Sequence, residues 1–431
     1  MNLKNINKNK YWLPIVLMLM YFYIGELKNI IYFNSLVWLG SLAFAMILLF
    51  NINGKTFLIS KENITWILVW IFFIVLRNQN VKYGIDYGIL YYAFMIITMI
   101  LLNKSTNWIK CMIRFLEIIC MMHAIITIIS SISSNFYFNF IIPIISSEYR
   151  SDVIGWYNNG SMAGLTSHYS VNGMYLAIGT GIVVVVSIID KNQKRWKRII
   201  YPSIMMFALL LTTKRAHLIF MIFSVSIVYL IYNYERIGRS ILKLIVLIII
   251  LIFIYFIVSM FVPSILVVYD RLFNSDYSTM GGRTQLYEEA IKLFKDNPII
   301  GNGWGAYKNY VQYTVGANYS TEYAKMNAHN IYLQLLAETG IIGFSAFVGL
   351  MTYNLQKAIK VIKKIVRYNI CNIETNVNIA ILLFIQVFFI LYGFTGNPLY
   401  DAPMYMPYML SCAGVSAINY ALKYKKIINN N

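Results

Sequence analysis

Three ionisable residues mark the points where an otherwise apolar chain becomes polar: Arg215, Arg283 and His329. An arginine guanidinium stays charged in proteins and forms bidentate hydrogen bonds to phosphate oxygens. Histidine titrates near neutral pH and can accept a proton from a hydroxyl group. These side chains together could hold an anion and accept a proton from a hydroxyl group.

The two arginines occupy different local settings. Arg215 follows Lys214 between two apolar runs, where it either anchors the membrane edge or faces a polar cavity. Arg283 precedes the run TQLYEEAIKLF, in which apolar residues recur at helical spacing. The dipole of that helix favours an anion near its beginning, so the arginine and the exposed backbone amides could bind one anion together. A solvated loop arginine is the alternative.

A glycine-rich turn follows this helix. Pro298 ends the helix, because the residue before a proline avoids the helical conformation. Gly301, Gly303 and Gly305 then predict a tight turn or a close approach of the backbone to another group. The turn lacks the preceding strand and the acidic partner of a dinucleotide-binding fingerprint. A substrate-binding turn and a plain turn are the two interpretations.

His329 precedes the run NIYLQLLAE, which opens the next apolar segment. If this run is helical, Asn330, Gln334 and Glu338 share one face. A polar stripe on a membrane helix faces the bundle interior or a water-filled cavity. His329 is therefore a candidate proton acceptor beside such a cavity, and a structural histidine at a helix cap is the alternative.

The composition places these residues in a membrane protein. Of the 431 residues, 59% are hydrophobic and 12% are charged, and the mean hydropathy is +0.62, whereas a soluble domain has about 25% charged residues. The net charge of +19 is what basic cytoplasmic loops produce, so nucleic acid is not an expected partner. The four cysteines have no Cys-x-x-Cys spacing and no carboxylate cluster has metal-ligand spacing, so no disulfide, metal or cofactor is expected.

The elements that must position these residues are membrane helices, each needing about 20 apolar residues. Lipid-exposed irregular backbone is excluded at membrane depth, so the fold class is an all-α polytopic bundle forming a single integral membrane domain over residues 1–431. The apolar runs predict about twelve spans. The expected spans are 11–25, 30–50, 64–78, 85–102, 109–132, 171–189, 199–213, 215–233, 241–262, 330–355, 377–395 and 404–422.

Lysine and arginine set the orientation. Placing both termini in the cytoplasm puts about two thirds of the 36 basic residues on that side, as the positive-inside rule requires. Two long loops, 133–170 and 263–329, then face outward. Long loops are usually functional, and both of these lie on the same side as Arg215, Arg283 and His329. We therefore expect an extracytoplasmic active site on a multi-pass protein of the cytoplasmic (inner) membrane.

Four stretches resemble the O-antigen ligase and polymerase (Wzy-like) family of integral-membrane glycosyltransferases. They are residues 212–217 (TTKRAH), 281–283 (GGR), 298–305 (PIIGNGWG) and 328–343 (AHNIYLQLLAETGIIG). The His-Asn…Glu-x-Gly part of the last stretch matches most closely. Lys214 is a departure, because the family often has serine there, and Arg150 in the first outer loop also resembles a family arginine.

The resemblance implies a GT-C-like fold with a large extracytoplasmic loop, and it implies roles for particular residues. His329, Arg215 and Arg283 are then catalytic. The expected substrate-binding residues are Lys214, Arg150, Gly301, Gly303, Gly305, Asn330 and Glu338.

The implied activity is polymerisation of O-antigen or capsule repeat units. Glycan would pass from undecaprenyl diphosphate to a hydroxyl of an acceptor glycan at the outer face of the lipid bilayer, with a flippase and a chain-length regulator as further partners. An O-antigen ligase is the alternative within the family. A lipid-linked oligosaccharide flippase is the alternative of another class, although such a protein needs charges spread through its spans. The spans predicted here contain few charged residues or histidines apart from Arg114, Glu117, His123 and Glu338.

Overall fold

The computed structural model describes residues 10–32, 34–53, 61–78, 88–246, 279–314 and 326–428. Within these ranges every regular element is a helix and no strand occurs. This confirms the all-α prediction, which rested on the requirement that each membrane segment satisfy its own backbone hydrogen bonds.

Eleven of the predicted spans coincide with helices, and the range 241–262 lies mostly outside the described residues. The helix ends differ from the predicted ones by a few residues, except that the last helices extend further. The helices are α2 (Trp12–Tyr23), α4 (Ser35–Asn53), α5 (Lys61–Asn78), α6 (Gly88–Leu102), α7 (Ile109–Ile132), α10 (Tyr169–Ile189), α11 (Arg195–Leu211), α12 (Arg215–Tyr232), α17 (Ile331–Tyr368), α18 (Ile373–Tyr392) and α19 (Ala402–Ile428).

Among the described residues, five helices are long and apolar enough to cross a membrane by length and composition: α7, α10, α12, α17 and α18. Shorter apolar helices cover Trp12–Tyr23, Val37–Ile52 and Asn63–Phe73. The membrane character is thus supported by several helices, and the number of twelve spans stays a prediction.

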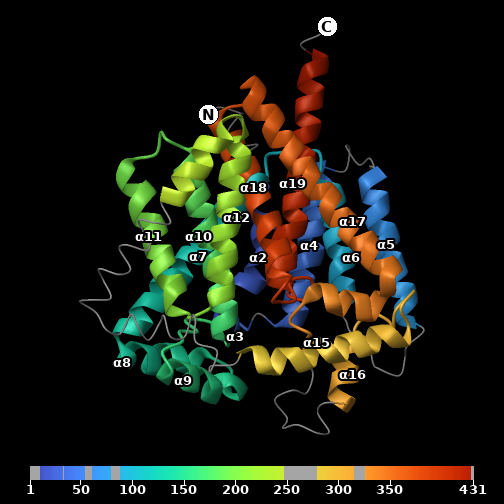
Figure 1. Cartoon of the computed structure of the whole chain (residues 1–431). Helices are drawn as coiled ribbons and strands as arrows, with labels where there is room; N and C mark the ends of the chain where they lie inside the picture. Colours follow the sequence, from blue (N-terminus) through green and yellow to red (C-terminus); the bar gives the residue numbers. More distant parts are fainter. Residues whose placement is uncertain are drawn as a thin grey trace.

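The core of the bundle lies around α10 and α18, which appear at the centre of Figure 1. α10 packs against α7, α11, α12 and α18. All residues of α18 from Ile379 to Phe389 are buried, and the Phe384, Phe388 and Phe389 side chains are fully so, as expected for a helix surrounded by other helices.

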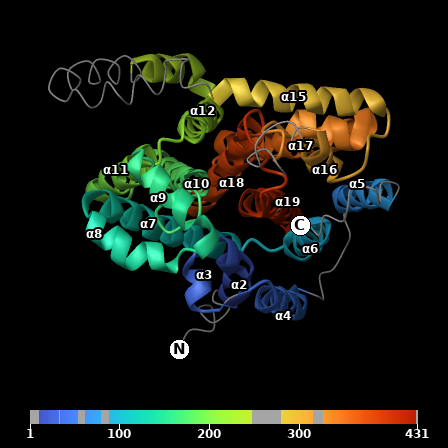
Figure 2. The same ribbon diagram turned by 90° about the horizontal axis from the view of Figure 1, so that it is seen from below.

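One end of the bundle carries the helices of the two predicted outer loops (Figures 1 and 2). α15 crosses this end and begins beside α12, while α8 and α9 lie on the other side of the bundle axis. α19 ends at the opposite end (Figure 1). The elements here are α3 (Leu27–Ile30), α8 (Ser134–Phe136), η3 (Tyr137–Ile141), η4 (Ile142–Ile144), η5 (Ser147–Tyr149), α9 (Arg150–Asn158), α15 (Thr279–Asp296) and α16 (Ala306–Thr314); η6 (Tyr234–Arg236) follows α12.

The helix α17 is interrupted at Gly340, where the sequence predicts one continuous span. Gly340 has φ of +62°, a left-handed conformation that glycine adopts without steric penalty. The interruption frees two backbone N–H groups of α17, so that Ile341 donates to the Pro298 carbonyl at 2.9 Å and Ile342 donates to the Ile299 carbonyl at 3.2 Å. α17 therefore consists of two helical parts that meet at Gly340, and the first part carries the residues that follow His329.

Candidate active site

The glycine turn, residues 298–305, lies against the first half of α17. The N–H of Gly303 donates to the Glu338 carbonyl at 2.8 Å. Gly301 and Gly340 face each other so closely that a Cβ on Gly301 would lie 2.4 Å from the Glu338 carbonyl oxygen. Glycine is required at this contact because the two backbones touch. The two family-like motifs, 298–305 and 328–343, thus form one unit.

The Glu338 side chain completes this unit. It is fully buried, and its carboxylate accepts hydrogen bonds from the N–H of Gly305 at 2.9 Å and of Tyr307 at 3.3 Å. The Tyr400 hydroxyl donates to the same carboxylate. A buried carboxylate is stabilised by such donors, so Glu338 positions the glycine turn.

Gln334 connects Glu338 to the segment that carries His329. Its Nε2 donates to the Glu338 carboxylate at 3.1 Å, and its Oε1 accepts from the N–H of Ala328 at 3.0 Å. The Asn397 amide also donates to this Oε1, which joins the turn before α19 to α17. Gln334 and Glu338 of the predicted polar stripe are thus hydrogen-bonded to each other, and Gln334 holds Ala328, the residue before His329, in place.

His329 has an unusual backbone. Its φ is +52°, which is uncommon for a residue with a side chain and which persists only when neighbouring contacts enforce it. Asn330 provides one such contact as the N-cap of α17, since its side chain accepts from the N–H of Tyr332 at 3.0 Å and of Leu333 at 3.2 Å. The histidine side chain is half-buried at the start of the helix.

Arg283 reaches the same place from α15. Tyr287, one helical turn after Arg283 and on the same face, donates from its hydroxyl to the His329 carbonyl at 3.4 Å. α15 packs along α17, and Arg283 is half-buried. The face of α15 that carries Arg283 is thus turned toward the start of α17.

Lys214 arrives from a third element, the turn before α12. Thr213 has φ of +54°, and its hydroxyl lies 2.6 Å from that of Ser161 in the first outer loop. The N–H of Met162 donates to the Leu211 carbonyl at 3.0 Å. These contacts fix the turn, and the Lys214 ammonium lies 4.9 Å above the centre of the Tyr169 ring.

Lys214, Arg283, His168 and His329 lie close enough for their charges to interact, and we call these four residues the cationic cluster. Burial and the positive charges of Arg283 and Lys214 together lower the pKa of His329 to about 4. Burial and the charge of Arg283 lower the pKa of Lys214 to about 8. At neutral pH the cluster therefore combines two cations with neutral imidazoles.

His168 is the member that the sequence prediction omitted. Burial, Lys214 and His329 lower the pKa of His168 to about 4. Its Nδ1 accepts from the N–H of Ser170 at 2.9 Å as the N-cap of α10, so the proton of the neutral ring is on Nε2. The ring packs at 4.3 Å from Trp156 and 4.7 Å from Tyr169. A histidine alone on a loop gave no sequence signal beyond its presence beside a predicted span.

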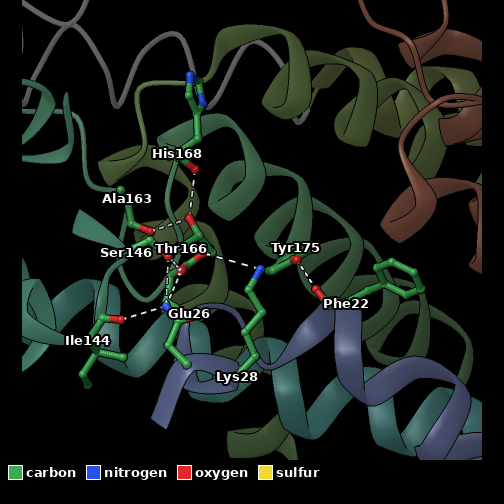
Figure 3. A network of polar contacts seen from close by, with 10 residues as sticks. Phe22, Glu26, Lys28, Ile144, Ser146, Ala163, Thr166, His168 and Tyr175 are labelled. Carbon is green, nitrogen blue, oxygen red and sulfur yellow. Dashed lines mark hydrogen bonds and ion pairs between the residues drawn. The ribbon is translucent and has the colours of Figure 1, made fainter. Parts of the chain in front are cut away.

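Figure 3 shows how the loop that ends at His168 is held. The Thr166 hydroxyl contacts the carbonyls of Ala163 and His168, each at 2.8 Å. The N–H of Glu26 donates to the Leu165 carbonyl at 2.8 Å, which ties this loop to the end of α2.

The Glu26 carboxylate is buried and serves the same network (Figure 3). It accepts from the Asn29 amide at 2.8 Å and from the Ser146 hydroxyl at 3.4 Å. Lys28 lies 3.7 Å away. Figure 3 places this network below His168, whose ring points away from it. Glu26 is thus a structural carboxylate that supports the loop under His168.

Asp401 adds a carboxyl group to this end of the bundle. It lies half-buried just before α19, and burial raises its pKa to about 6 although the charge of Lys308 opposes the shift. Asp401 and Arg283 both lie close enough to the Tyr392 hydroxyl for electrostatic interaction.

The structure separates the predicted site residues into three groups. His329, Arg283 and Lys214 share the cationic cluster, and Arg215 is the half-buried first residue of α12 beside Lys214. Gly301, Gly303, Gly305 and Glu338 form the adjoining turn, and Asn330 caps α17.

Arg150 has its own partners. Its guanidinium donates to the carbonyls of Ile145 and Pro143, both at 2.7 Å, and among the described residues neither hydrogen bond reaches the cluster. These bonds fold the first outer loop, and a substrate contact of Arg150 stays a prediction.

No group of three or more His, Cys, Asp or Glu side chains that could hold a metal ion occurs among the described residues. The arrangement offers instead two cations and two uncharged imidazoles, all on partly buried residues. Such a site can bind a polyanion and transfer protons.

Comparison with known proteins gives one family match. Residues 201–348 match the family model described as O-antigen ligase. The matched range contains Lys214, Arg283, the glycine turn, His329 and Glu338. No match was found among curated proteins. The family match supports the O-antigen ligase/polymerase family, whose members are glycosyltransferase-like enzymes.

Proposed function

We propose that this chain, which carries an O-antigen ligase family segment over residues 201–348, is a polysaccharide polymerase. It would transfer a glycan from a polyprenyl diphosphate carrier, undecaprenyl diphosphate, to a hydroxyl of an acceptor glycan. The observation that carries the proposal is that Lys214 and Arg283 come from different elements and act together on the neutral His329.

The two cations suit the leaving group. Transfer breaks the bond between the anomeric carbon and a diphosphate oxygen, and the electron pair stays on the diphosphate. Lys214 and Arg283 would stabilise the developing negative charge in a partly dry site, where such interactions are strong. Binding of the anionic donor also offsets the electrostatic repulsion between Lys214 and Arg283.

His329 suits the nucleophile. The acceptor hydroxyl oxygen forms the new bond to the anomeric carbon, and its proton passes to the neutral imidazole of His329. The low pKa of His329 in the free protein comes from burial and from the two cations. A bound diphosphate neutralises these cations and raises the pKa, so that donor binding makes the histidine a stronger base.

Single substitutions test the site. We expect Arg283→Ala, Lys214→Ala and His329→Ala each to lower transfer by about 10²-fold or more while the protein stays folded in detergent. Lys295→Ala is the matched control, because Lys295 is an exposed cation on the same helix as Arg283. Unchanged long-chain product in all three site variants would refute the proposal.

The product pattern of a deletion strain separates polymerase from ligase. A polymerase deletion leaves single repeat units on the carrier or acceptor, whereas a ligase deletion leaves long chains on the carrier. If no carrier-linked unit reaches the outer face, the chain is a flippase.

We also propose that the site lies outside the cytoplasm and that both termini are cytoplasmic. This follows from the distribution of lysine and arginine. In a variant lacking native cysteines, Lys295→Cys should react with a membrane-impermeant thiol reagent in intact cells. Reaction only after permeabilisation would place the site inside.

A further inference from the structure

A large cavity lies at the end of the bundle opposite the candidate active site. Its volume is about 910 Å³, and it lies between the beginnings of α2, α7 and α18 and the end of α19. α7 continues from here to α8 at the site end, so the two regions are separated by the length of a spanning helix. Nothing in the proposed transfer reaction uses this cavity.

The cavity is lined by charges of both signs. Lys110 and Glu374 form an ion pair at 2.9 Å across it, and both side chains are about half exposed. Arg114 also lines it, one turn further along the spanning helix α7, and is exposed. Among the described residues no ion pair within 4.0 Å includes Arg114. A cation this far along a membrane helix requires a polar partner.

An apolar groove of about 660 Å³ adjoins the cavity, with Ile118 lining both. The groove runs between α7, α10 and α11, and its walls include Met121, Ile125 and Val186. Glu117 and Lys197 are the charged residues that line it. A charged cavity that opens into an apolar groove matches the charged headgroup and the apolar acyl chain of a lipid.

We propose that the cavity binds a glycerophospholipid with a phosphoethanolamine headgroup, with an acyl chain in the adjoining groove. The lipid phosphate pairs with Arg114, because a guanidinium group can donate two parallel hydrogen bonds to phosphate oxygens. The ammonium group donates to Glu374. The Glu374 carboxylate, whose Oε2 also pairs with Lys110, disfavours a headgroup that lacks an ammonium group, and a choline headgroup has no N–H to donate to it.

Native mass spectrometry of the purified full-length protein tests this assignment. After delipidation in detergent, the protein is titrated with phosphatidylethanolamine, phosphatidylcholine, phosphatidylglycerol or glycerol 3-phosphate. We expect one phosphatidylethanolamine to bind in preference to the other two lipids, and Arg114→Gln to weaken that binding about fivefold, the effect of one cation at a membrane surface. Glycerol 3-phosphate without chains should bind much less.

Four further variants make the test decisive. Arg239→Gln removes an exposed cation outside the cavity and should bind like the original protein. Glu374→Gln should reduce the preference for ethanolamine over choline, and Ile118→Trp should obstruct the passage into the groove. Equal lipid binding by the Arg114→Gln and Arg239→Gln variants would overturn the site. Equal or tighter binding of phosphatidylglycerol would overturn the headgroup, and equal binding of glycerol 3-phosphate would overturn the role of the groove. Arg114→Lys keeps the charge and should retain most of the binding if loss in Arg114→Gln reflects the site and not misfolding.

Discussion

The carboxylate of Glu338 accepts a hydrogen bond from the backbone N–H of Gly305 at 2.9 Å, although 33 positions separate the two residues. This contact joins the glycine turn to the helix whose beginning carries His329. It explains why Glu338 and the glycine turn occur together with His329: their contact fixes the part of α17 that positions His329. A disturbance at Glu338 should therefore reach His329 through Gln334.

Glu338→Gln tests this connection. The amide nitrogen would face N–H donors that now point at a carboxylate, so the unfolding free energy should fall by about 1–3 kcal/mol. Transfer should fall by about 10²-fold because His329 loses its position. Thermal unfolding and product assays measure the two effects. Glu288→Gln, an exposed change on α15, should alter neither, and a fully active Glu338→Gln variant would contradict the positioning role.

Gly340→Ala should destabilise the protein. A methyl group there would lie 2.3 Å from the Ile299 carbonyl oxygen, and φ of +62° adds strain of about 1–3 kcal/mol. Gly349→Ala in the same helix is the control, because its Cβ would meet nothing within 4 Å. It should leave stability unchanged or raise it by up to about 1 kcal/mol. Equal melting temperatures of the two variants would show that the contact between the turn and α17 is dispensable.

The pH dependence of transfer should report His329. The base must be neutral, and the pKa of His329 in the free protein is about 4. The acid limb of kcat/KM should therefore lie near pH 4, since that quantity reflects the free enzyme. The limb of kcat should lie at higher pH, because bound diphosphate raises the pKa. His329→Gln should remove this limb along with most of the activity, while identical limbs for kcat and kcat/KM would argue against coupling between donor and base.

Lys214 should make diphosphate binding dependent on pH. Its pKa in the folded protein, about 8, is lower than the ordinary lysine value of 10.5, so the folded state loses stability as the pH falls from 10.5 to about 8 and the full penalty is present below pH 8. A bound anion relieves that penalty only when the lysine is charged. Farnesyl diphosphate should thus raise the melting temperature more at pH 7 than at pH 9.5. The difference should vanish in Lys214→Met and persist in Lys295→Met; a pH-independent shift in the original protein would exclude this role.

His168→Asn separates the two functions of His168. Asparagine is a good N-cap and can still accept from the N–H of Ser170, but it removes the Nε2–H donor of the cluster. We expect near-normal stability with weaker farnesyl diphosphate binding, by about tenfold to a hundredfold for one lost hydrogen bond to a charged group. His168→Ala should lose stability as well. Normal binding by His168→Asn would leave the residue with a capping role alone.

The sequence by itself determined the helical architecture, because apolar runs of membrane length leave the backbone no other way to satisfy its hydrogen bonds. It also predicted the stripe from Asn330 to Glu338, since helical periodicity places Asn330, Gln334 and Glu338 on one face. Arg283 and His329 were candidates because each precedes a helical run. These are local properties that spacing along the chain expresses directly.

Only the tertiary structure decided which groups meet. Lys214, Arg283, His168 and His329 come from four segments, and their mutual effect on pKa depends on distance and burial that no spacing encodes. The same holds for the interruption of α17 at Gly340, which exists because the Pro298 and Ile299 carbonyls pair with its freed N–H groups. Contacts between distant segments are set by packing of the whole bundle, and so the site emerges only when the chain is folded.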